Sequence, residues 1–469
     1  MEYFLSMTGL QHAELCTHLL APDGKEAAAV ALCGRRAGDE RYRLVIQKVH
    51  LLPYAACQRS EVSIEWPTDL IIELLDEADR RSLSVVKFHS HPGGYAHFSR
   101  VDDETDNLLF PRIAGWVEAD VPHASVVMLP GGRMLGRIFA AGAFQAISRV
   151  SVIGDDIDFW FHDEFNALQS AEALPAFTKR HAQAFGERTT QLLRRLRVAV
   201  IGCSGTGSIV IEQLMRLGVG ELVLVDPDVT KDLNLNRIIN ATAQDATDQR
   251  PKTDVAAAAI VRTGLGTRVR AFPSSLYNAK VVREVAECDV LMGCVDTHEG
   301  RFLLNRIATF YCLPYIDVGV ALDADQSGAI TQVCGYLHYF QPDRSSVLSR
   351  GVVDILQVAA EALKRRNPEA YAKERKVGYI ANVDEDRPAV ISVNTVLAGM
   401  AVNELLARLH RFRHDDNREF AVIGVSISQI AFYPEREPDQ PCKLFARYVG
   451  LGDITPLLDM PELSEFAEA

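Results

Sequence analysis

Residues 194–226 carry the feature that most constrains how this chain folds. The apolar segment RRLRVAVIG (194–202) has the composition of a buried strand, GSIVIEQLMRLGV (207–219) has helical spacing, and ELVLVD (221–226) is strand-like again. A strand, a helix and a second strand in such close succession predict a βαβ unit, with both strands parallel in one sheet. The chain is therefore expected to contain an α/β domain with a mainly parallel, Rossmann-like sheet.

The first part of the chain has a different pattern. It indicates an α+β fold with an opening helix, a helix near 68–81, and strands at 27–34, 42–52, 83–92, 124–130 and 133–140. A chain of 469 residues also exceeds the ~250 residues that one hydrophobic core usually supports. We therefore expect an α+β domain over 1–158, a connector and lead-in helix over 159–192, and the α/β domain over 193–469. Residues 412–440, rich in charge and proline, predict a late excursion before the C-terminal tail.

Charge and apolar patterning argue against two classes of protein. The formal net charge of −13 disfavours a general nucleic-acid binder, which needs basic surface to displace counterions from phosphates. No run approaches the ~20 apolar residues of a membrane-spanning helix, and the first residues lack the pattern of a secretory leader. The nine cysteines include no C-x-x-C pair. This favours reduced thiols in a soluble, cytoplasmic protein with no nucleic-acid or membrane partner.

A histidine cluster ends one predicted strand of the first domain. In FHSHPGGYAHFSRVD (88–102), His89 and His91 are two residues apart, so on a strand both imidazoles point to the same side. Ser99 and Asp102 have the S-x-x-D spacing of a helix start, from which a carboxylate can return towards the histidines. Two imidazoles and one carboxylate make a three-ligand zinc site with a fourth position for water. Spacing alone does not identify the carboxylate that takes the proton of that water.

The order of these residues resembles the JAMM (JAB/MPN+) metalloproteases, which cleave after the C-terminal glycine of ubiquitin-like proteins. The motif of that family is a distant glutamate followed by H-[ST]-H-P-x6-S-x2-D, and residues 89–102 match every fixed position. The resemblance implies that His89, His91 and Asp102 bind zinc. It also implies that Ser99 helps to hold the oxyanion of the reaction.

The family glutamate lies on an early strand after a turn. The segment PDGKEAAAVALCG offers Glu26 in that setting, and the resemblance implies that Glu26 is the general base. The alternative is a solvated carboxylate at the end of a strand. His97, in the loop of the motif, is interpreted as a surface or substrate-contacting residue and not as a ligand.

The second domain begins with a glycine-rich loop. Gly202, Gly205 and Gly207 form G-x-x-G-x-G after the first strand of the βαβ unit, and Asp226 ends the second strand. Glycines allow a tight turn and let a phosphate approach the N–H groups at the start of the helix, while the aspartate can hold ribose hydroxyls. By itself, this pattern is most typical of NAD(P) enzymes.

Polar residues further along the chain favour ATP instead. Asn234 and Arg237 follow as N-x-x-R, Lys252 lies in RPKTDVAAAA, and Asp296 ends the apolar strand CDVLMGCVD. Adenylyl transfer develops charge on the departing pyrophosphate, which added cations stabilise. A carboxylate at the C-terminal end of a strand can hold Mg²⁺. Taken singly, Lys252 has the alternative of a surface lysine, and Asp296 that of a helix N-cap.

This ordered set resembles the ThiF/MoeB and ubiquitin-activating enzyme superfamily over roughly residues 176–408. The resemblance resumes at PAVISVNTVLAGMAVNELL (388–406), which is similar to the helix that closes this fold. It implies ATP and Mg²⁺ as cofactors, and adenylation of a C-terminal glycine with release of pyrophosphate. The implied roles are ribose binding by Asp226, phosphate binding by Asn234, Arg237 and Lys252, and Mg²⁺ binding by Asp296.

A further arginine is implied upstream of the βαβ unit. Arg180, in KRHAQAFGERTTQLLRRLRV, lies where the entry arginine of this superfamily reaches ATP, often across a homodimer. Arg188 is the alternative position for it. A homodimer through the second domain is therefore expected.

The cysteines depart from the patterns of this superfamily. Many members hold a structural zinc with two C-x-x-C pairs, but HYFQPDRSSVLSRG has no cysteine and Cys442 stands alone, so we expect no zinc in the second domain. Residues 335–441 also lack the cysteine that thioester-forming relatives carry. Cys334 is the nearest candidate, with a buried core cysteine as the alternative. Cys203, inside the glycine loop, is expected only to fit there.

Together, the two resemblances predict a bifunctional enzyme of a bacterial ubiquitin-like conjugation pathway. The first domain would mature a ubiquitin-like precursor or remove the modifier from targets. The second would adenylate the terminal glycine and pass it to a conjugating-enzyme-like partner, and similar bacterial fusions suggest a role in antiviral defence. One alternative is a sulfur-carrier system for cofactor or cysteine biosynthesis. Another is a scaffold that binds ubiquitin-like proteins without chemistry.

Overall fold

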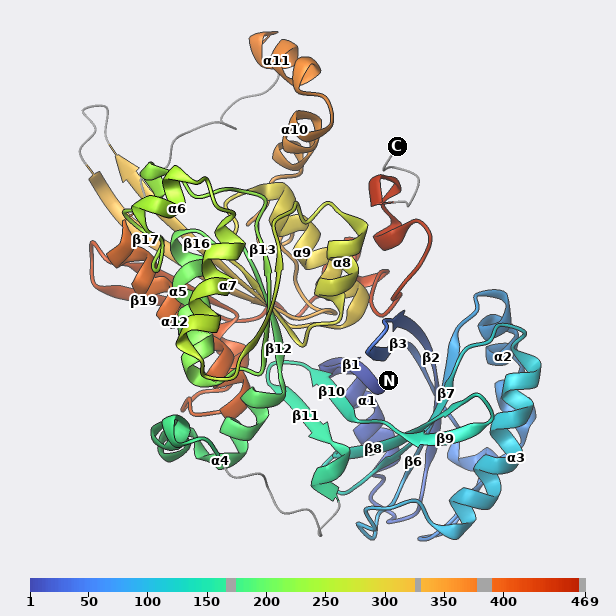
Figure 1. The fold of residues 1–469 in the computed structure, drawn as a ribbon. Helices are drawn as coiled ribbons and strands as arrows, with labels where there is room; N and C mark the ends of the chain where they lie inside the picture. The colour runs from blue at the N-terminus through green and yellow to red at the C-terminus, as the bar shows by residue number, and fades with distance from the viewer. Residues whose placement is uncertain (166–173, 325–329, 378–389, 464–469) are drawn as a thin grey trace. The chain divides into compact units, whose positions relative to one another are not determined.

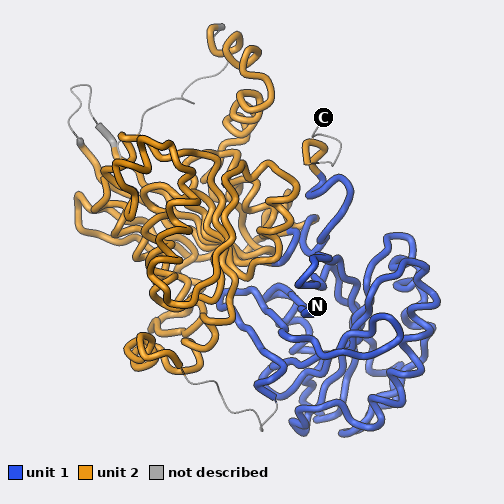
Figure 2. Tube along the Cα trace, viewed as in Figure 1, with its two compact units in different colours: residues 1–172, 310–312, 448–459 blue, residues 173–309, 313–447, 460–469 orange. Residues whose placement is uncertain are grey.

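The computed structural model describes residues 1–165, 174–324, 330–377 and 390–463, and these form two compact units (Figure 2). The first unit contains Met1–Glu172, Phe310–Cys312 and Tyr448–Asp459, and the second contains Ala173–Thr309, Leu313–Arg447 and Met460–Ala469. The division falls within the predicted connector, 159–192, of which residues 166–173 lie outside the described part. Residues 448–459, predicted as part of the second domain, lie in the first unit.

The first unit is built on a nine-stranded mixed sheet with the order β11-β10-β1-β3-β2-β6-β7-β8-β9 (Figure 1). Its strands are β1 (Glu2–Thr8), β2 (Ala28–Ala37), β3 (Arg41–Leu51), β6 (Ser84–Ser90), β7 (His123–Met128), β8 (Met134–Ala140), β9 (Ala143–Ala146), β10 (Arg149–Ile153) and β11 (Ile157–Phe161). A separate two-stranded ribbon joins β4 (Gln58–Arg59) to β5 (Ile64–Glu65). The predicted strands from 27 to 140 are confirmed, whereas β1 precedes the expected opening helix.

Three helices cover the two faces of this sheet. Residues of α1 (Gly9–Leu19) pack into one apolar cluster with alternate residues of β2, including Ala29 and Ala31. Residues of α2 (Ile72–Arg80) and α3 (Arg100–Trp116) pack into a second cluster with the intervening residues, including Val30 and Leu32. Because successive side chains of a strand point to opposite faces, β2 is buried on both sides. The early apolar run of the sequence is therefore a central strand.

The segment 448–459 packs against the backbone of β2 and β3. Gly452 pairs with Arg35 in an isolated parallel bridge, and the N–H of Asp453 donates to the carbonyl of Arg35 at 2.6 Å. A Cβ added to Gly450 would lie 2.2 Å from the carbonyl oxygen of Ile46. Only glycine allows this close approach of two backbones. A segment far away in the sequence thereby becomes part of the first unit.

The second unit is built on an eight-stranded sheet with the order β14-β13-β12-β15-β16-β17-β18-β19. The strands are β12 (Arg197–Ile201), β13 (Glu221–Val225), β14 (Arg268–Phe272), β15 (Val290–Gly293), β16 (Tyr315–Ala324), β17 (Ile330–Phe340), β18 (Val422–Ser426) and β19 (Ala431–Glu435). The pairs among β12 to β16 are parallel, and the later pairs are antiparallel. The predicted Rossmann-like, mainly parallel arrangement is confirmed.

Helices cover both faces of this second sheet. The helices of the second unit are α4 (Lys179–Arg195), α5 (Gly205–Leu217), α6 (Ala243–Thr247), α7 (Lys252–Thr263), α8 (Ala279–Ala286), α9 (His298–Tyr311), α10 (Ile355–Arg366), α11 (Pro368–Val377), α12 (Ile391–His410) and α13 (Lys443–Ala446). Figure 1 shows α5, α7 and α12 on one face and α8 and α9 on the other. The helix α12 matches the closing helix predicted in the segment 388–406, of which residues 388 and 389 lie outside the described part. No helix in the described part of the chain is long and apolar enough to cross a membrane.

The prediction of an excursion over 412–440 is wrong. This stretch contributes β18 and β19, which extend the sheet at its antiparallel edge. The strand β18 is short, and a charged stretch precedes it in sequence. Residues of β19 are mostly exposed and include a proline, which an edge strand tolerates because one of its sides needs no ladder hydrogen bonds. Composition therefore obscured two strands that only sheet pairing reveals.

Candidate functional site

The first candidate site lies where β6 ends beside the start of α3. The Nε2 atoms of His89 and His91 are 3.2 Å apart. The carboxylate of Asp102 places Oδ1 2.8 Å from Nε2 of His89 and Oδ2 3.3 Å from Nε2 of His91. One ligand atom from each residue lies within 4.8 Å of the others, and all three side chains are buried. The structure therefore brings together the three predicted zinc ligands.

Local sequence explains why these side chains converge. His89 is the last but one residue of β6 and pairs with Ala28, and His91 directly follows the strand. Gly94 then adopts a positive φ of 78°, which reverses the chain towards α3. Ser99 is the N-cap of α3, and Asp102 is the N3 residue of a capping box. The capping geometry directs the aspartate back to the two histidines.

Burial and hydrogen bonds within this cluster shift the pKa of each of its members. Burial lowers the pKa of His89 to about 4, which keeps its imidazole neutral. Burial alone would raise the pKa of Asp102, but hydrogen bonds from His89 and His91 outweigh it and hold that pKa far below its usual range. The Nδ1 of His91 donates to the carbonyl oxygen of Tyr95 at 2.8 Å. Burial alone would lower the pKa of His91, but the hydrogen bonds with Asp102 and Tyr95 outweigh it and raise that pKa. Two imidazoles and a carboxylate are a ligand set that fits zinc.

Glu26 lies beside this cluster, immediately before β2. Its side chain is 5% exposed. Burial raises the pKa of Glu26 to about 7, and the charge of Asp102 adds to this effect while that of His91 opposes it. A carboxylate with a pKa near neutrality can exchange a proton in both directions. The structure therefore places the predicted base next to the predicted ligands.

Arg59, which sequence reasoning missed, holds the turn that carries Glu26. Its Nε donates to the carbonyl oxygen of Glu26 at 2.7 Å, and its two terminal nitrogens contact the carboxylate of Asp23 at 3.0 and 3.1 Å. The N–H of Glu26 donates to the carbonyl of Ser60 at 2.7 Å. The two-stranded ribbon β4–β5 thus fixes the backbone of the candidate base. No motif in the sequence indicates this arginine.

The second candidate site is a cavity of about 730 Å³ in the second unit, at the carboxyl ends of β12, β13 and β15. Most of the predicted nucleotide-binding residues line it, namely Gly202, Gly205, Asp226, Asn234, Arg237, Lys252 and Asp296. Ligands of open parallel sheets bind at this edge, where the strand order reverses. The structure therefore brings together residues that are up to 94 positions apart (296 − 202) around one cavity.

The glycine loop allows backbone contacts that larger residues would block. Gly202 has a φ of 92°, and a Cβ there would lie 2.5 Å from the carbonyl oxygen of Cys294. A Cβ on Gly205 would lie 2.1 Å from Nδ2 of Asn394, which reaches the loop from α12. Gly207 does not line the cavity, but a Cβ there would lie 1.7 Å from the carbonyl oxygen of Gly202. Two of the three glycines therefore face the cavity and the third closes the turn.

The carboxylate of Asp226 links β13 to the glycine loop. It accepts from the N–H of Cys203 at 2.7 Å and from that of Asp228 at 2.9 Å. Burial raises the pKa of Asp226, and Lys252, whose Nζ lies 3.9 Å away, partly offsets this effect. The same Nζ lies 2.7 Å from Asp228. An anion and a cation thus lie next to each other in the wall of the cavity.

Three more cations line the cavity and were not predicted: Lys231, Arg301 and Arg365. Arg301 forms an ion pair with Asp317 at 3.1 Å. Arg365, on α10, pairs with Glu299 at 2.7 Å and lies 3.8 Å above the ring of Tyr277. The sequence positions of Arg301 and Arg365 give no signal, because α9 and α10 bring these two residues to the cavity only through tertiary packing.

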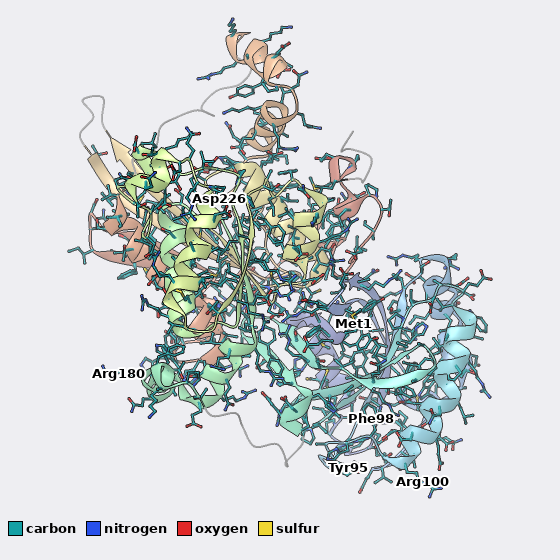
Figure 3. All side chains as sticks on the ribbon, in the orientation of Figure 1. Met1, Tyr95, Phe98, Arg100, Arg180 and Asp226 are labelled. Atoms are coloured by element: carbon teal, nitrogen blue, oxygen red, sulfur yellow. The ribbon has the colours of Figure 1, made fainter. Side chains whose placement is uncertain are left out.

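Other predicted residues lie elsewhere. Arg180 and Arg188 are on α4 and neither lines the cavity, and Figure 3 shows Arg180 away from Asp226. Cys334 is half-buried within β17, where it pairs with Ala321 and Ser426 of the neighbouring strands. The roles proposed for these residues stay predictions.

The remaining cysteines of the second unit that were singled out are buried. Burial raises the pKa of the Cys203 thiol well above its usual value. The N–H of Cys442 donates to the carbonyl of Arg344 at 2.9 Å. The nearby loop is held by Glu437, which accepts from the hydroxyl of Ser345 at 2.6 Å and pairs with Arg350. These contacts join the two stretches in which the sequence lacks C-x-x-C pairs.

Both units match known protein families. A model of the ThiF family matches residues 178–443, which include the whole glycine loop and every predicted residue of the nucleotide cavity. A model of prokaryotic homologs of the JAB domain matches residues 11–136, which include Glu26 and the three predicted zinc ligands.

Each of the similar proteins covers only a part of the chain. The ubiquitin-like modifier-activating enzyme 5 of Culex quinquefasciatus is 26% identical over 208 residues, 41% of this chain and 49% of that protein. The SAMP-activating enzyme E1 of Haloferax volcanii is 33% identical over 120 residues, 26% of this chain and 44% of that protein. A structure of E. coli MccB with succinimide has a TM-score of 0.44 at 17% identity, covering 58% of this chain and 75% of that one. The chain spans about half the length of the curated relatives it matches.

Proposed function

Because this chain belongs to the ThiF family, whose model matches residues 178–443, we propose that its second unit adenylates the C-terminal carboxylate of a ubiquitin-like protein. The observation that carries this proposal is the cavity itself. Asp226, Arg237, Lys252 and Asp296 line one space beside a glycine loop at the start of a helix. Anion-binding N–H groups, cations for phosphates and a carboxylate for Mg²⁺ are what adenylyl transfer from ATP requires.

Each residue group would have a distinct role in this reaction. The carboxylate of Asp226 would hold ribose hydroxyls, and the N–H groups at the start of α5 would face the phosphates. Asn234, Arg237 and Lys252 would stabilise the charge that develops on pyrophosphate as the carboxylate attacks the α-phosphorus. Asp296 would hold Mg²⁺, which when bound would offset the negative charge of the phosphates. The products would be an acyl-adenylate and pyrophosphate.

The first unit is proposed to hydrolyse the bond after the C-terminal glycine of such a protein, either to mature a precursor or to release the modifier from a target. His89, His91 and Asp102 would hold zinc, which when bound supplies Lewis-acid chemistry at the scissile carbonyl. Glu26 would accept a proton from the attacking water and return it to the leaving amine. The hydroxyl of Ser99 would donate to the developing oxyanion.

The two activities share one substrate feature, a C-terminal glycine, and this supports placing them in one pathway. Cleavage would expose the glycine that adenylation then activates. The adenylate would pass to a conjugating-enzyme-like partner, and Arg180 would complete the cavity of a second copy in a homodimer. A bacterial conjugation pathway, of the kind used in antiviral defence, is the setting proposed for these steps.

The test measures the mass of candidate ubiquitin-like proteins that carry a short extension after the terminal glycine. Each is incubated with MgATP, Zn²⁺ and either the wild-type chain, Glu26→Ala or Asp296→Ala. A truncated mass that depends on Glu26, and pyrophosphate release that depends on Asp296, support the respective halves. Lys280→Ala, an exposed change on α8, controls for nonspecific effects on the second unit.

The outcomes also separate the alternatives. A thiocarboxylate on the carrier in the presence of sulfide, without conjugates, would favour a sulfur-carrier system. Binding of the ubiquitin-like protein by a chain that takes up neither zinc nor ATP would favour a scaffold. Cleavage that persists in Glu26→Ala, or pyrophosphate release that persists in Asp296→Ala, would contradict the proposed chemistry of that half.

A further inference from the structure

Two parallel contacts join β6 to the first turns of α3. Lys87 and His89 are two residues apart on β6, so their side chains point to the same face. Asp102 and Asp106 are four residues apart on α3, so their side chains also share a face. His89 faces Asp102 at 2.8 Å, and Lys87 faces Asp106 at 2.5 Å. The contact of His89 with Asp102 and that of Lys87 with Asp106 therefore form two adjacent pairs between β6 and α3, and the first pair belongs to the candidate metal site.

Arg137, on β8, contacts the α3 residue of each pair, Asp102 and Asp106. Its Nη2 donates to the main-chain carbonyl of Asp102 at 3.1 Å and to the carboxylate of Asp106 at 2.8 Å. Its Nη1 donates to the carboxylate of Asp103 at 2.5 Å. All three acceptors lie in the first two turns of α3. A single planar guanidinium thus fixes the height and rotation of the segment that carries Asp102.

The guanidinium is itself held in place. It lies 4.0 Å from the ring centroid of Phe98 and 4.5 Å from that of Phe144. The side chain of Arg137 is 14% exposed, and the carboxylate of Asp106 is fully buried. A buried carboxylate with two cationic partners has little freedom to move, because separating it from either partner leaves a charge without compensation. The hydrogen bonds from Arg137 to α3, here called the clamp, are therefore held in place at both ends.

We propose that Arg137 is a positioning residue for the metal site: its guanidinium fixes the first turn of α3 so that the carboxylate of Asp102 faces His89 and His91. The inference rests on the proposed function of the first unit, since it requires that a metal binds there. Outer partners that orient a metal ligand typically contribute a factor of 10 to 100 in affinity. Arg137 contacts no predicted ligand atom, so its effect passes through the backbone of Asp102.

The test uses the full chain and the metal ion alone. Co²⁺ is titrated into the metal-free protein while its d–d absorption is recorded, and Zn²⁺ affinity is measured by competition with a chromophoric chelator. Arg137→Met is expected to weaken both affinities about 10–100-fold and to change the Co²⁺ spectrum. Arg137→Lys keeps the charge but not the planar fork, so it is expected to give an intermediate loss.

A matched control lies on the same helix. Arg100 pairs with Glu104 at 2.9 Å, but its side chain is 91% exposed, and Arg100→Met is expected to bind metal like the wild type. Fluorescence of Trp66, Trp116 and Trp160, all in the first unit, reports whether each variant folds. If Arg137→Met does not fold, Asp103→Asn removes one exposed acceptor of the clamp and is expected to weaken Co²⁺ binding several-fold.

Each outcome decides the inference. Metal affinity and spectrum unchanged in a folded Arg137→Met, or in Asp103→Asn where that variant replaces it, would overturn the positioning role. Wild-type affinity in Arg137→Lys would overturn the requirement for the planar fork. An equal loss in Arg100→Met would assign the effect to the helix as a whole. A wild-type chain that binds neither ion would contradict the proposed function of the first unit, which is a different failure.

Discussion

Ser99 and Asp102 cap the same helix reciprocally. The N–H of Ser99 donates to Oδ2 of Asp102 at 2.6 Å, and the N–H of Asp102 donates to Oγ of Ser99 at 3.2 Å. The same carboxylate faces His89 and His91. One capping box therefore starts α3 and aims a metal ligand. Stability and ligand geometry depend on the same two residues.

Ser99→Ala is expected to lower the free energy of unfolding of the first unit by about 1 kcal/mol, because the N-cap acceptor is lost. Urea unfolding of the metal-free chain, followed by tryptophan fluorescence, measures this change. Ser99→Thr keeps the hydroxyl and is expected to stay close to the wild type. Equal stability of Ser99→Ala and Ser99→Thr would argue against an energetic role for the cap.

Arg59→Met is expected to slow cleavage without weakening zinc binding. Arg59 holds the backbone of Glu26 but contacts none of the three predicted ligands. A shift of the base by about 1 Å can cost up to about 100-fold in rate, so kcat should fall while KM changes little. Steady-state cleavage and chelator competition measure the two effects separately, with the exposed Arg80→Met as control. A lower zinc affinity would instead indicate that Arg59 supports the whole site.

Gly205→Ala is expected to abolish most ATP binding. The added Cβ would lie 2.1 Å from Nδ2 of Asn394 and 3.1 Å from Cδ of Arg237. In the double variant Gly205→Ala with Asn394→Ala, the first and most severe overlap is gone, so part of the affinity should return. Calorimetric titration with a nonhydrolysable ATP analogue compares both with Asn394→Ala alone. No recovery in the double variant would show that the loop backbone, and not this overlap, limits binding.

Stability of the first unit is expected to depend on pH through Asp106. Burial alone would raise the pKa of this carboxyl, but Lys87 and Arg137 outweigh burial and hold the pKa below its ordinary value. A carboxyl with a lowered folded pKa stabilises the fold above its unfolded pKa of about 3.9, and this contribution is lost as the pH falls through the folded pKa.

Asp106→Asn tests this dependence. At pH 7 the free energy of unfolding of the variant should be about 3–5 kcal/mol lower than that of the wild type, because Lys87 is left buried without its partner. The difference between the two should shrink below about pH 4. Urea unfolding at a series of pH values, read by tryptophan fluorescence, provides the comparison. A difference that stays constant down to pH 3 would contradict the assignment to this ion pair.

Some features of the protein follow from local sequence. The βαβ unit, the capping box at Ser99 and the H-x-H strand end each depend on residues within a few positions of one another, so their spacing predicts their geometry. The glycine loop belongs to the same group, because its turn needs Gly202 at a positive φ of 92°. This is why the three predicted zinc ligands and the two glycines that line the cavity could be named from the sequence.

Other features were decided only by tertiary structure. Arg59, Arg137 and Arg365 look like ordinary polar residues in sequence, and their roles arise from partners on elements that are distant along the chain. The strands β18 and β19 and the return of residues 448–459 to the first unit likewise depend on pairing with distant backbone. Local spacing thus determines which side chains an element presents and in which direction. Long-range packing determines which charges meet, because burial and pairing energies depend on neighbours that spacing does not specify.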